Sequence, residues 1–259
     1  MSYEIVCKDA LKYLESRGAE SVQLVYIDPP FNRGYGHYND DGEGYEDDYG
    51  SFSSYAAFLS PVLQELYRIL TPNGSLFFHI DWHWSHYCKV VLLDKIFGRN
   101  NCLNEIIWSY DYGGRPKNRW PQKHDTIFWY VKSLSDYTFN LEASDRLPYM
   151  APNLVGEEKA ARGKTPTDVW WNTIVPTNSK ERTGYPTQKP MSILERIILV
   201  HSNPGDTVLD CFAGSGTTGA AAIKHGRKAV LIDSNTQAIA IMRERLQTET
   251  TQSLTSESS

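Results

Sequence analysis

Short apolar runs alternate with longer segments of helical period along most of the chain, and this alternation limits the folds open to it. The runs are rich in Val, Ile and aromatic residues, as buried strands are. The candidate strands are Glu4–Cys7, Val22–Ile27, Ser75–Ile80, Glu105–Tyr110, Thr126–Val131, Thr207–Asp210 and Ala229–Ile232. The candidate helices are Ala10–Arg17, Ser53–Leu70, Tyr87–Phe97, Met191–Val200, Thr217–Lys224 and Thr236–Leu246. Strands that alternate with helices pair mainly in parallel, so the pattern predicts an α/β fold with one seven-stranded, mostly parallel sheet and helices on both faces.

The composition is that of a globular protein. Hydrophobic residues make up 41% and aromatic residues 12% of the 259 residues, which excludes a disordered or collagen-like chain. No apolar run approaches the ~18 residues of a membrane-spanning helix, and the N-terminal segment does not resemble a targeting peptide. The cysteines form no CxxC pair, which favours a reducing compartment. We therefore expect a cytoplasmic protein with no membrane partner and no cysteine-rich zinc site.

Three segments depart from the alternation of strands and helices. Residues 32–50 carry six acids and five glycines, and we expect a mobile loop there. Residues 133–185 are irregular and broken by prolines, which predicts a small insertion within the α/β domain. Residues 248–259 are polar and rich in Ser and Thr, which predicts a disordered tail after one domain spanning 1–247.

A glycine-rich turn follows the candidate strand at 207–210, in the sequence DCFAGSGTTG. Gly214 and Gly216 permit a tight turn into the next helix and let the backbone approach a ligand closely. Asp233 ends the following strand, where a carboxylate can accept hydrogen bonds from both ribose hydroxyls of a nucleoside. The loop is neither a P-loop nor a GxGxxG loop, so a cofactor without phosphates, such as S-adenosylmethionine (SAM), suits it best. An ordinary strand-to-helix turn is the structural alternative.

A second turn, Asp28-Pro29-Pro30-Phe31, follows the buried strand at 22–27. Two consecutive prolines make a stiff turn whose carbonyl groups point beyond the carboxyl end of the strand, where α/β sheets bind ligands. Asp28 and the Pro29 carbonyl can accept the two hydrogens of an exocyclic amino group, and Phe31 can stack on a planar base. A purely structural turn is the alternative, and the presence of the glycine-rich turn in the same chain favours the functional interpretation.

These motifs, in this order, resemble those of the SAM-dependent DNA amino-methyltransferases that modify adenine N6 or cytosine N4, in the circularly permuted beta-class arrangement. The family's (D/S)PP(Y/F) motif corresponds to Asp28–Phe31 and its FxGxG motif to 212–216. Tyr185-Pro-Thr-Gln-Lys-Pro190 resembles the family's HPTQKP segment, with Tyr185 in place of the usual His. The resemblance covers roughly residues 3–247 and implies a Rossmann-like SAM-dependent methyltransferase fold.

The resemblance implies methyl transfer from SAM to the amino nitrogen of a base that is flipped out of double-stranded DNA at a specific site. It assigns the catalytic role to Asp28, Pro29, Pro30 and Phe31. It places Asp9 near the adenine of SAM, although Asp9 could equally cap the helix that follows it. The other expected cofactor-binding residues are Ala10, Thr187, Lys189, Pro190, Asp210, Phe212, Ala213, Gly214, Gly216, Thr217, Asp233 and Ser234. Asp as the first motif residue slightly favours adenine over cytosine, and a cognate restriction endonuclease and a monomer or homodimer agree with the family.

The formal net charge of −5 speaks against a nucleic-acid partner only as a whole-chain sum. Residues 112–132 carry five basic residues against Asp125 alone, with Trp120 and Trp129 between them. We expect this segment to contact DNA phosphates beside a stacking surface, and the insertion at 133–185 to be the target-recognition region. The expected DNA-binding residues are Arg115, Lys117, Arg119, Lys123, Arg162, Lys164, Lys180 and Arg182. A solvated basic face is the alternative.

The sequence HIDWHWSH contains His79, Asp81, His83 and His86 but matches no metal-ligand spacing, so we predict structural roles and no metal site. Other functions are open at this point. A methyltransferase acting on RNA or on a protein amide would need the same Asp-Pro-Pro turn. A nucleotide-dependent oxidoreductase would use the glycine-rich turn but leave Asp28–Phe31 and Tyr185–Pro190 without a role, and a non-catalytic DNA-binding module would not need intact motifs.

Overall fold

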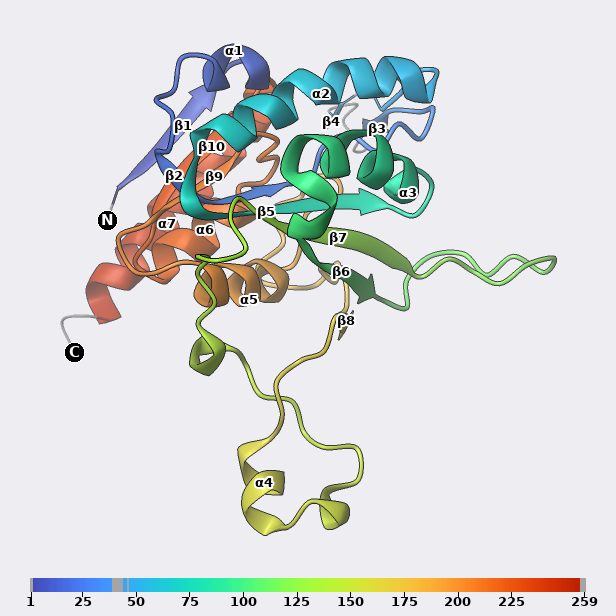
Figure 1. Cartoon of the computed structure of the whole chain (residues 1–259), viewed down its shortest axis with the longest axis vertical. Coiled ribbons are helices and arrows are strands. Elements are labelled where there is room, and N and C mark those ends of the chain that lie inside the picture. Colours follow the sequence, from blue (N-terminus) through green and yellow to red (C-terminus); the bar gives the residue numbers. More distant parts are fainter. Residues whose placement is uncertain (1, 39–43, 46, 257–259) are drawn as a thin grey trace.

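The computed structural model describes residues 2–38, 44–45 and 47–256, and a mixed eight-stranded sheet lies at its centre (Figure 1). The strands follow the order β1-β10-β9-β2-β5-β7-β6-β8, and a separate hairpin pairs β3 with β4. Their bounds are β1 Tyr3–Cys7, β2 Val22–Ile27, β3 His37–Tyr38, β4 Gly44–Tyr45, β5 Leu70–Asp81, β6 Cys102–Ser109, β7 His124–Val131, β8 Val169–Trp171, β9 Thr207–Asp210 and β10 Lys228–Asp233. Neighbours in the large sheet are parallel except at β7, which is antiparallel to β5 and β6.

Helices cover both faces of the large sheet and enclose two hydrophobic cores. The helices are α1 Ala10–Leu14, α2 Phe52–Ile69, α3 Ser85–Tyr87, the π-helix η1 Cys88–Gly98, η2 Arg99–Asn101, η3 Leu141–Ala143, η4 Pro152–Leu154, α4 Glu157–Arg162, α5 Met191–His201, α6 Thr217–Lys224 and α7 Thr236–Ser256. Residues of α1, α2 and η1 form one core, and residues of α5, α6 and α7 form the other. Since successive strand residues point to opposite faces, Phe78 of β5 packs in the first core and Phe77 in the second.

The N-terminal strand completes the sheet beside the C-terminal strand. β1 pairs in parallel with β10, with Cys7 opposite Asp233, and β10 pairs in parallel with β9. The strand that follows β10 in space therefore comes first in the sequence. This pairing agrees with the circular permutation that the motif order predicts.

The sheet has eight strands rather than the predicted seven, and the additional strand comes from the insertion at 133–185. β8 pairs in parallel with β6, with Trp170 opposite Trp108, and both indole rings are buried. The indole N–H of Trp108 donates to the Asn172 carbonyl at 2.8 Å, which fastens the strand. A three-residue strand is too short to show an alternating pattern, so the sequence does not reveal it.

The prediction of a disordered tail from residue 248 is wrong for the part of it that the structure describes. Helix α7 continues to Ser256, while 257–259 lie outside the described residues. The hydroxyl groups of Thr248, Thr250 and Thr251 donate to carbonyls four residues earlier, at 3.1, 2.8 and 2.9 Å. Hydroxyl side chains that bond back to the preceding turn can be accommodated in a helix, which a composition argument overlooks.

The two ends of the acidic segment 32–50 are tied together. The Asp47 side chain accepts from the Asn32 N–H, the Tyr49 N–H donates to Asn32 Oδ1 at 2.7 Å, and Asp47 is fully buried. Gly34 N–H donates to the Asp47 carbonyl at 2.9 Å. The expected mobile loop also covers 39–43 and 46, which lie outside the described residues.

Two projections extend from the body near β6, β7 and β8 (Figure 1). One is the connection 110–123 between β6 and β7, and the other is the part of the insertion that carries α4 at its far end. No helix in the described part of the chain has the length and apolar character to cross a membrane.

Candidate active site

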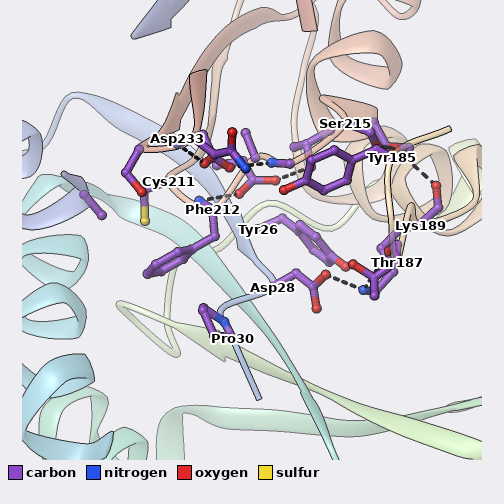
Figure 2. Close-up of a pocket in the computed structure, with 18 of the residues that line it drawn as sticks. Tyr26, Asp28, Pro30, Tyr185, Thr187, Lys189, Cys211, Phe212, Ser215 and Asp233 are labelled. Carbon is purple, nitrogen blue, oxygen red and sulfur yellow. Dashed lines mark hydrogen bonds and ion pairs between the residues drawn. The ribbon is translucent and has the colours of Figure 1, made fainter. Parts of the chain in front are cut away.

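A cavity of about 290 Å³ lies beyond the carboxyl ends of the parallel strands β2, β9 and β10. Both sequence turns border it, because the glycine-rich turn follows β9 and the Asp-Pro-Pro-Phe turn follows β2. We call it the cofactor cavity. Figure 2 shows Asp233, Phe212 and Ser215 on one side of it and Asp28 and Lys189 on the other.

The glycine-rich turn has a shape that only glycine permits. Gly214 and Gly216 have φ angles of +49° and +73°. A Cβ at Gly214 would stand 3.0 Å from the Tyr185 ring, and one at Gly216 would stand 2.7 Å from Met242 Cγ. Gly214 therefore keeps the cavity wall close to Tyr185, whereas Gly216 packs against α7.

Acidic side chains dominate the charge of the cofactor cavity. Within the described part of the chain, Asp9, Asp28, Asp210 and Asp233 line it, and Lys189 is the one cationic side chain among the lining residues. Burial raises the pKa of Asp233, whose two oxygens accept from Gly214 N–H at 2.9 Å and Asn235 N–H at 2.8 Å. The Ser234 N–H also interacts with this carboxylate, and since its oxygens offer about four acceptor positions, at least one remains for a ligand. This donor set fits a cationic nucleoside cofactor without phosphates, and SAM, which carries a sulfonium and an ammonium group, has these properties.

Asp210 is the most deeply buried acid of the cavity. Its oxygens accept from Phe212 N–H at 3.0 Å and from the Thr218 hydroxyl at 2.6 Å. Burial is the main cause that raises the pKa of Asp210 to about 7. Asp210 therefore braces the turn that carries Phe212 while it faces the cavity.

Asp28 lies between two cavities. A second cavity, of about 340 Å³, adjoins the first, and five residues line both: Asp28, Tyr185, Thr187, Gln188 and Lys189. Its remaining wall is rich in aromatic side chains, among them Phe31, Trp108, Tyr110 and Tyr112. We call it the base cavity. A carboxylate shared by the two cavities can face one ligand in each.

The two oxygens of Asp28 have different surroundings. Oδ2 accepts from Lys189 Nζ in an ion pair that is mostly buried (Figure 2). Oδ1 is buried and has no hydrogen-bond partner within the described part of the chain. His79 Nδ1 lies 3.6 Å from it, beyond hydrogen-bond distance. A buried, unsatisfied acceptor is costly, so Oδ1 is available for a donor that enters from a cavity.

His79 is a site residue that the sequence analysis assigned a structural role. Its Nδ1 bonds to the Tyr26 hydroxyl at 2.7 Å, and its Nε2 lies 3.3 Å from Asp125 Oδ2. The ring is fully buried and lies beside Asp28 because Ile27 and Phe78 are partners in the β2–β5 register. Among the described residues, no group of His, Cys, Asp or Glu is arranged to hold a metal ion.

Most of the predicted cofactor-binding residues line the cofactor cavity, and two do not. Pro190 is the N-cap residue of α5 and is buried outside the cavity, as is Gly216. Asp9 lines the cavity and also caps α1, because its Oδ1 accepts from Lys12 N–H at 3.0 Å. The further lining residues that the sequence analysis missed are Tyr26, Tyr49, Phe58, Gln188, Leu194, Cys211, Ser215, Thr218 and Asn235 in this cavity, and Arg33, Trp108, Tyr110, Tyr112, Asp125, Ile174, Val175 and Pro186 in the base cavity.

The predicted basic segment 112–132 divides into two parts. Arg115, Lys117 and Arg119 lie exposed on the projection between β6 and β7. Trp129, expected on a stacking surface, is only 5% exposed and packs on Phe77 in the core. Lys132 donates to the carbonyl of Leu70, the first residue of β5. It therefore lies at the amino ends of the parallel strands, whereas the cavities lie at their carboxyl ends. The prediction that Trp129 and Lys132 belong to a DNA surface is therefore wrong. Trp129 is buried in the core, and antiparallel β7 places Lys132 at the end of the sheet away from the cavities.

The remaining predicted basic residues differ in how they are held. Lys123 Nζ donates to the Tyr112 and Gly113 carbonyls, so it fastens the projection. Lys164 lies 5.9 Å from the centre of the Tyr149 ring, and its backbone pairs with that of Leu147. Arg162, Lys180 and Arg182 are exposed, and Arg182 also borders the base cavity.

Two adjoining cavities that share one carboxylate suit an enzyme that holds a cationic cofactor on one side and a planar base on the other, which is the arrangement of SAM-dependent amino-methyltransferases. The chain belongs to the N6/N4 DNA methylase family, whose model matches residues 22–244. It is a SAM-dependent DNA amino-methyltransferase, and this confirms the activity and cofactor expected from the motifs.

Two relatives support the membership. The chain is 32% identical to the type II methyltransferase M.HpaI of Haemophilus parainfluenzae over 96% of this chain and 76% of the relative. It is 34% identical to the DNA adenine methyltransferase YhdJ of Escherichia coli K12 over 93% of this chain and 82% of the relative.

Solved structures support the fold. The M1.HpyAVI–SAM complex matches with a TM-score of 0.64 at 22% identity. The aligned region covers 94% of this chain and 98% of the chain in that complex. The cytosine-N4-specific PvuII DNA methyltransferase has a TM-score of 0.68 at 18% identity and covers 98% and 93%. The predicted Rossmann-like methyltransferase fold is therefore confirmed.

Proposed function

We propose that this enzyme methylates the N6 amino group of adenine in double-stranded DNA at a specific site. The observation that carries the proposal is Asp28 Oδ1, a buried acceptor without a partner among the described residues, between the cofactor cavity and the base cavity. An amino group that enters the base cavity would satisfy it. Two further observations support adenine: the first motif residue is Asp, and a relative 34% identical is named a DNA adenine methyltransferase.

In this proposal the Asp-Pro-Pro-Phe turn handles the base. Asp28 Oδ1 and the Pro29 carbonyl accept the two hydrogens of the target amino group, and Phe31 stacks on the ring. The Tyr55 hydroxyl donates to the Pro30 carbonyl at 2.5 Å, which holds the turn in place. Accepting both hydrogens favours a pyramidal nitrogen with a more available lone pair. The Asp28 carboxylate or water then accepts the proton that this nitrogen releases.

The residues of the cofactor cavity hold SAM, which supplies an electrophilic sulfonium methyl group when bound. Asp233 accepts from a ribose hydroxyl through the acceptor capacity that Gly214, Ser234 and Asn235 leave available. Asp9 accepts from the amino group of the SAM adenine through Oδ2, because Oδ1 already accepts from the Lys12 N–H at the start of α1. Ala10, Phe212 and Ser234 form the adjoining wall.

The base that enters the pocket identifies the activity most clearly. Purified enzyme and isotope-labelled SAM are incubated in separate reactions with unmethylated genomic DNA, RNA or protein, and the DNA is digested to nucleosides for mass spectrometry. We expect N6-methyladenine as the only new nucleoside. N4-methylcytosine would contradict the choice of adenine, and label that appears in RNA or protein but not in DNA would contradict DNA as the substrate.

The two projections near β6 and β8 contact the DNA in this proposal. Lys117 and Arg119 have no side-chain partner among the described residues, and Arg182 borders the base cavity, so each is available for phosphate. Lys180 and Arg162 add positive charge on the insertion, which we propose as the target-recognition region.

The salt dependence of DNA binding tests this surface. Lys117→Ala and Arg119→Ala should each reduce the slope of log K against log salt concentration by about 1, because each removes one phosphate contact. Fluorescence anisotropy with a labelled duplex measures the slope. Lys132→Ala is the matched control from the same basic segment, since Lys132 lies at the end of the sheet away from the cavities, and it should leave the slope unchanged. Equal slopes for all three variants would contradict the assignment.

We further propose that the enzyme works in the cytoplasm as a monomer or homodimer and that a cognate restriction endonuclease acts on the same site. The cysteine pattern supports the compartment. The name of the relative M.HpaI as a type II methyltransferase supports the nuclease partner.

A further inference from the structure

Trp120 is 91% exposed on the connection between β6 and β7. We call residues 111–123 the basic hairpin. An indole ring is among the largest apolar groups a protein can place in water, and Trp108, Trp129 and Trp170 are buried, whereas Trp120 is the most exposed of the tryptophans. A ring held out in this way is suited to a partner that covers it.

The charge around Trp120 identifies the kind of partner. The basic hairpin carries Arg115, Lys117, Arg119 and Lys123 against Asp111 alone. A dense cluster of cations with an exposed aromatic ring between them complements a polyanion whose interior is built of stacked rings. Double-stranded DNA, the substrate class of this enzyme, has both properties.

The basic hairpin joins the body of the protein beside the base cavity. Tyr110 and Tyr112 line that cavity, and Tyr110 N–H donates to the Lys123 carbonyl at 3.0 Å. Lys123 Nζ donates to the Tyr112 and Gly113 carbonyls, so the two sides of the hairpin are joined there. Trp120 precedes Lys123 by three residues, which places its Cα within roughly 11 Å of this joint.

Two prolines restrict the backbone of the basic hairpin. Pro121 follows Trp120 directly, and Pro116 lies on the other side of the hairpin. Arg115 pairs with Asp111 four residues earlier. Trp120 is not among the residues that line the base cavity, where Phe31, Trp108 and Tyr110 already supply aromatic surface. Its ring is therefore placed for DNA outside the cavity rather than for the flipped base.

We propose that Trp120 inserts into the duplex beside the target and stacks in the space that the flipped base leaves. This inference rests on the proposed function, in which a base enters the base cavity. Flipping breaks the stacking of the target with its neighbours, and an inserted indole restores part of it. Trp120 is thus a positioning residue, which acts on the base through the remaining stack and not on the reacting atoms.

A comparison of two DNA substrates tests the insertion. One is a matched duplex, and the other has an abasic site opposite the target base, so that base pairing no longer opposes flipping. Trp120→Ala should lower kcat/KM about 10- to 100-fold on the matched duplex and less than about 3-fold on the abasic duplex. The stacking of the indole compensates for the base pair that flipping breaks, and only the matched duplex has this pair. Trp120→Phe should recover most of the activity on the matched duplex.

Arg119→Ala is the matched control, because a lost phosphate contact should weaken both substrates by the same factor. SAM binding and the melting temperature should be unchanged in Trp120→Ala, since the side chain is exposed. A second readout is 2-aminopurine at the target position, whose fluorescence increase on binding should be smaller with Trp120→Ala. Equal losses on both duplexes, or no loss on either, would overturn the insertion, whereas a wild-type enzyme that methylates neither duplex would overturn the proposed function instead.

Discussion

Asp28→Ala lowers kcat for DNA methylation by about 1,000-fold, because it removes the acceptor that orients the amino group and the base that accepts its proton. SAM affinity should change by less than about 5-fold, since Asp28 borders the cofactor cavity without closing it. Methyl transfer is measured with labelled SAM and duplex DNA, and SAM binding by calorimetry. Asp28→Asn keeps one carbonyl oxygen but loses the ion pair with Lys189, and it should retain only a small part of the activity.

Asp136→Ala is the control for this variant. Asp136 is exposed and lies after the end of β7, away from both cavities. It should leave kcat and SAM binding as in the wild type. Substantial turnover by Asp28→Ala would mean that the unpaired Oδ1 has no part in the reaction.

Asp233→Ala raises the dissociation constant of SAM about 10- to 100-fold, because it removes a charged acceptor from the ribose position. The variant also releases the Gly214 N–H, so part of the loss comes from a less ordered turn. Asp233→Asn separates the two effects, since its carbonyl oxygen can still accept from Gly214, and it should bind SAM more tightly than Asp233→Ala.

Calorimetry gives the affinity, and the increase in melting temperature on adding SAM gives an independent measure. That increase should be much smaller for Asp233→Ala than for the wild type. Unchanged SAM affinity in Asp233→Ala would contradict the assignment of this acid to the cofactor.

The part of the site that was predicted lies on single stretches of sequence. The strand Val22–Ile27 and the turn Asp28–Phe31 are contiguous, and the glycine-rich turn directly follows β9. Asp233 could be placed because β10 pairs with β9 through a short right-handed crossover, which α6 provides. Both motifs could be predicted because each consists of neighbouring residues, prolines in one and glycines in the other, with strong backbone preferences.

The missed part depends on strand pairings that span long stretches of sequence. His79 reaches Asp28 only because β5 pairs with β2, and Asp125 reaches His79 only because β7 runs antiparallel to β5. The same antiparallel strand explains the error at Lys132, which a parallel β7 would have brought to the cavities. Trp129 is buried because β7 lies between β5 and β6 in the sheet, and its residues from Asp125 to Val131 are buried on both faces. Strand order and direction were thus the information that the sequence pattern did not contain.

A single-turnover measurement tests most directly the claim that Asp28 joins cofactor and base. Wild-type enzyme and Asp28→Ala are each saturated with labelled SAM, mixed with excess duplex DNA, and the label in N6-methyladenine is followed with time. The account predicts that the wild type transfers its bound label in one turnover and that Asp28→Ala, equally loaded, transfers almost none. Transfer by Asp28→Ala at a rate close to that of the wild type would contradict it.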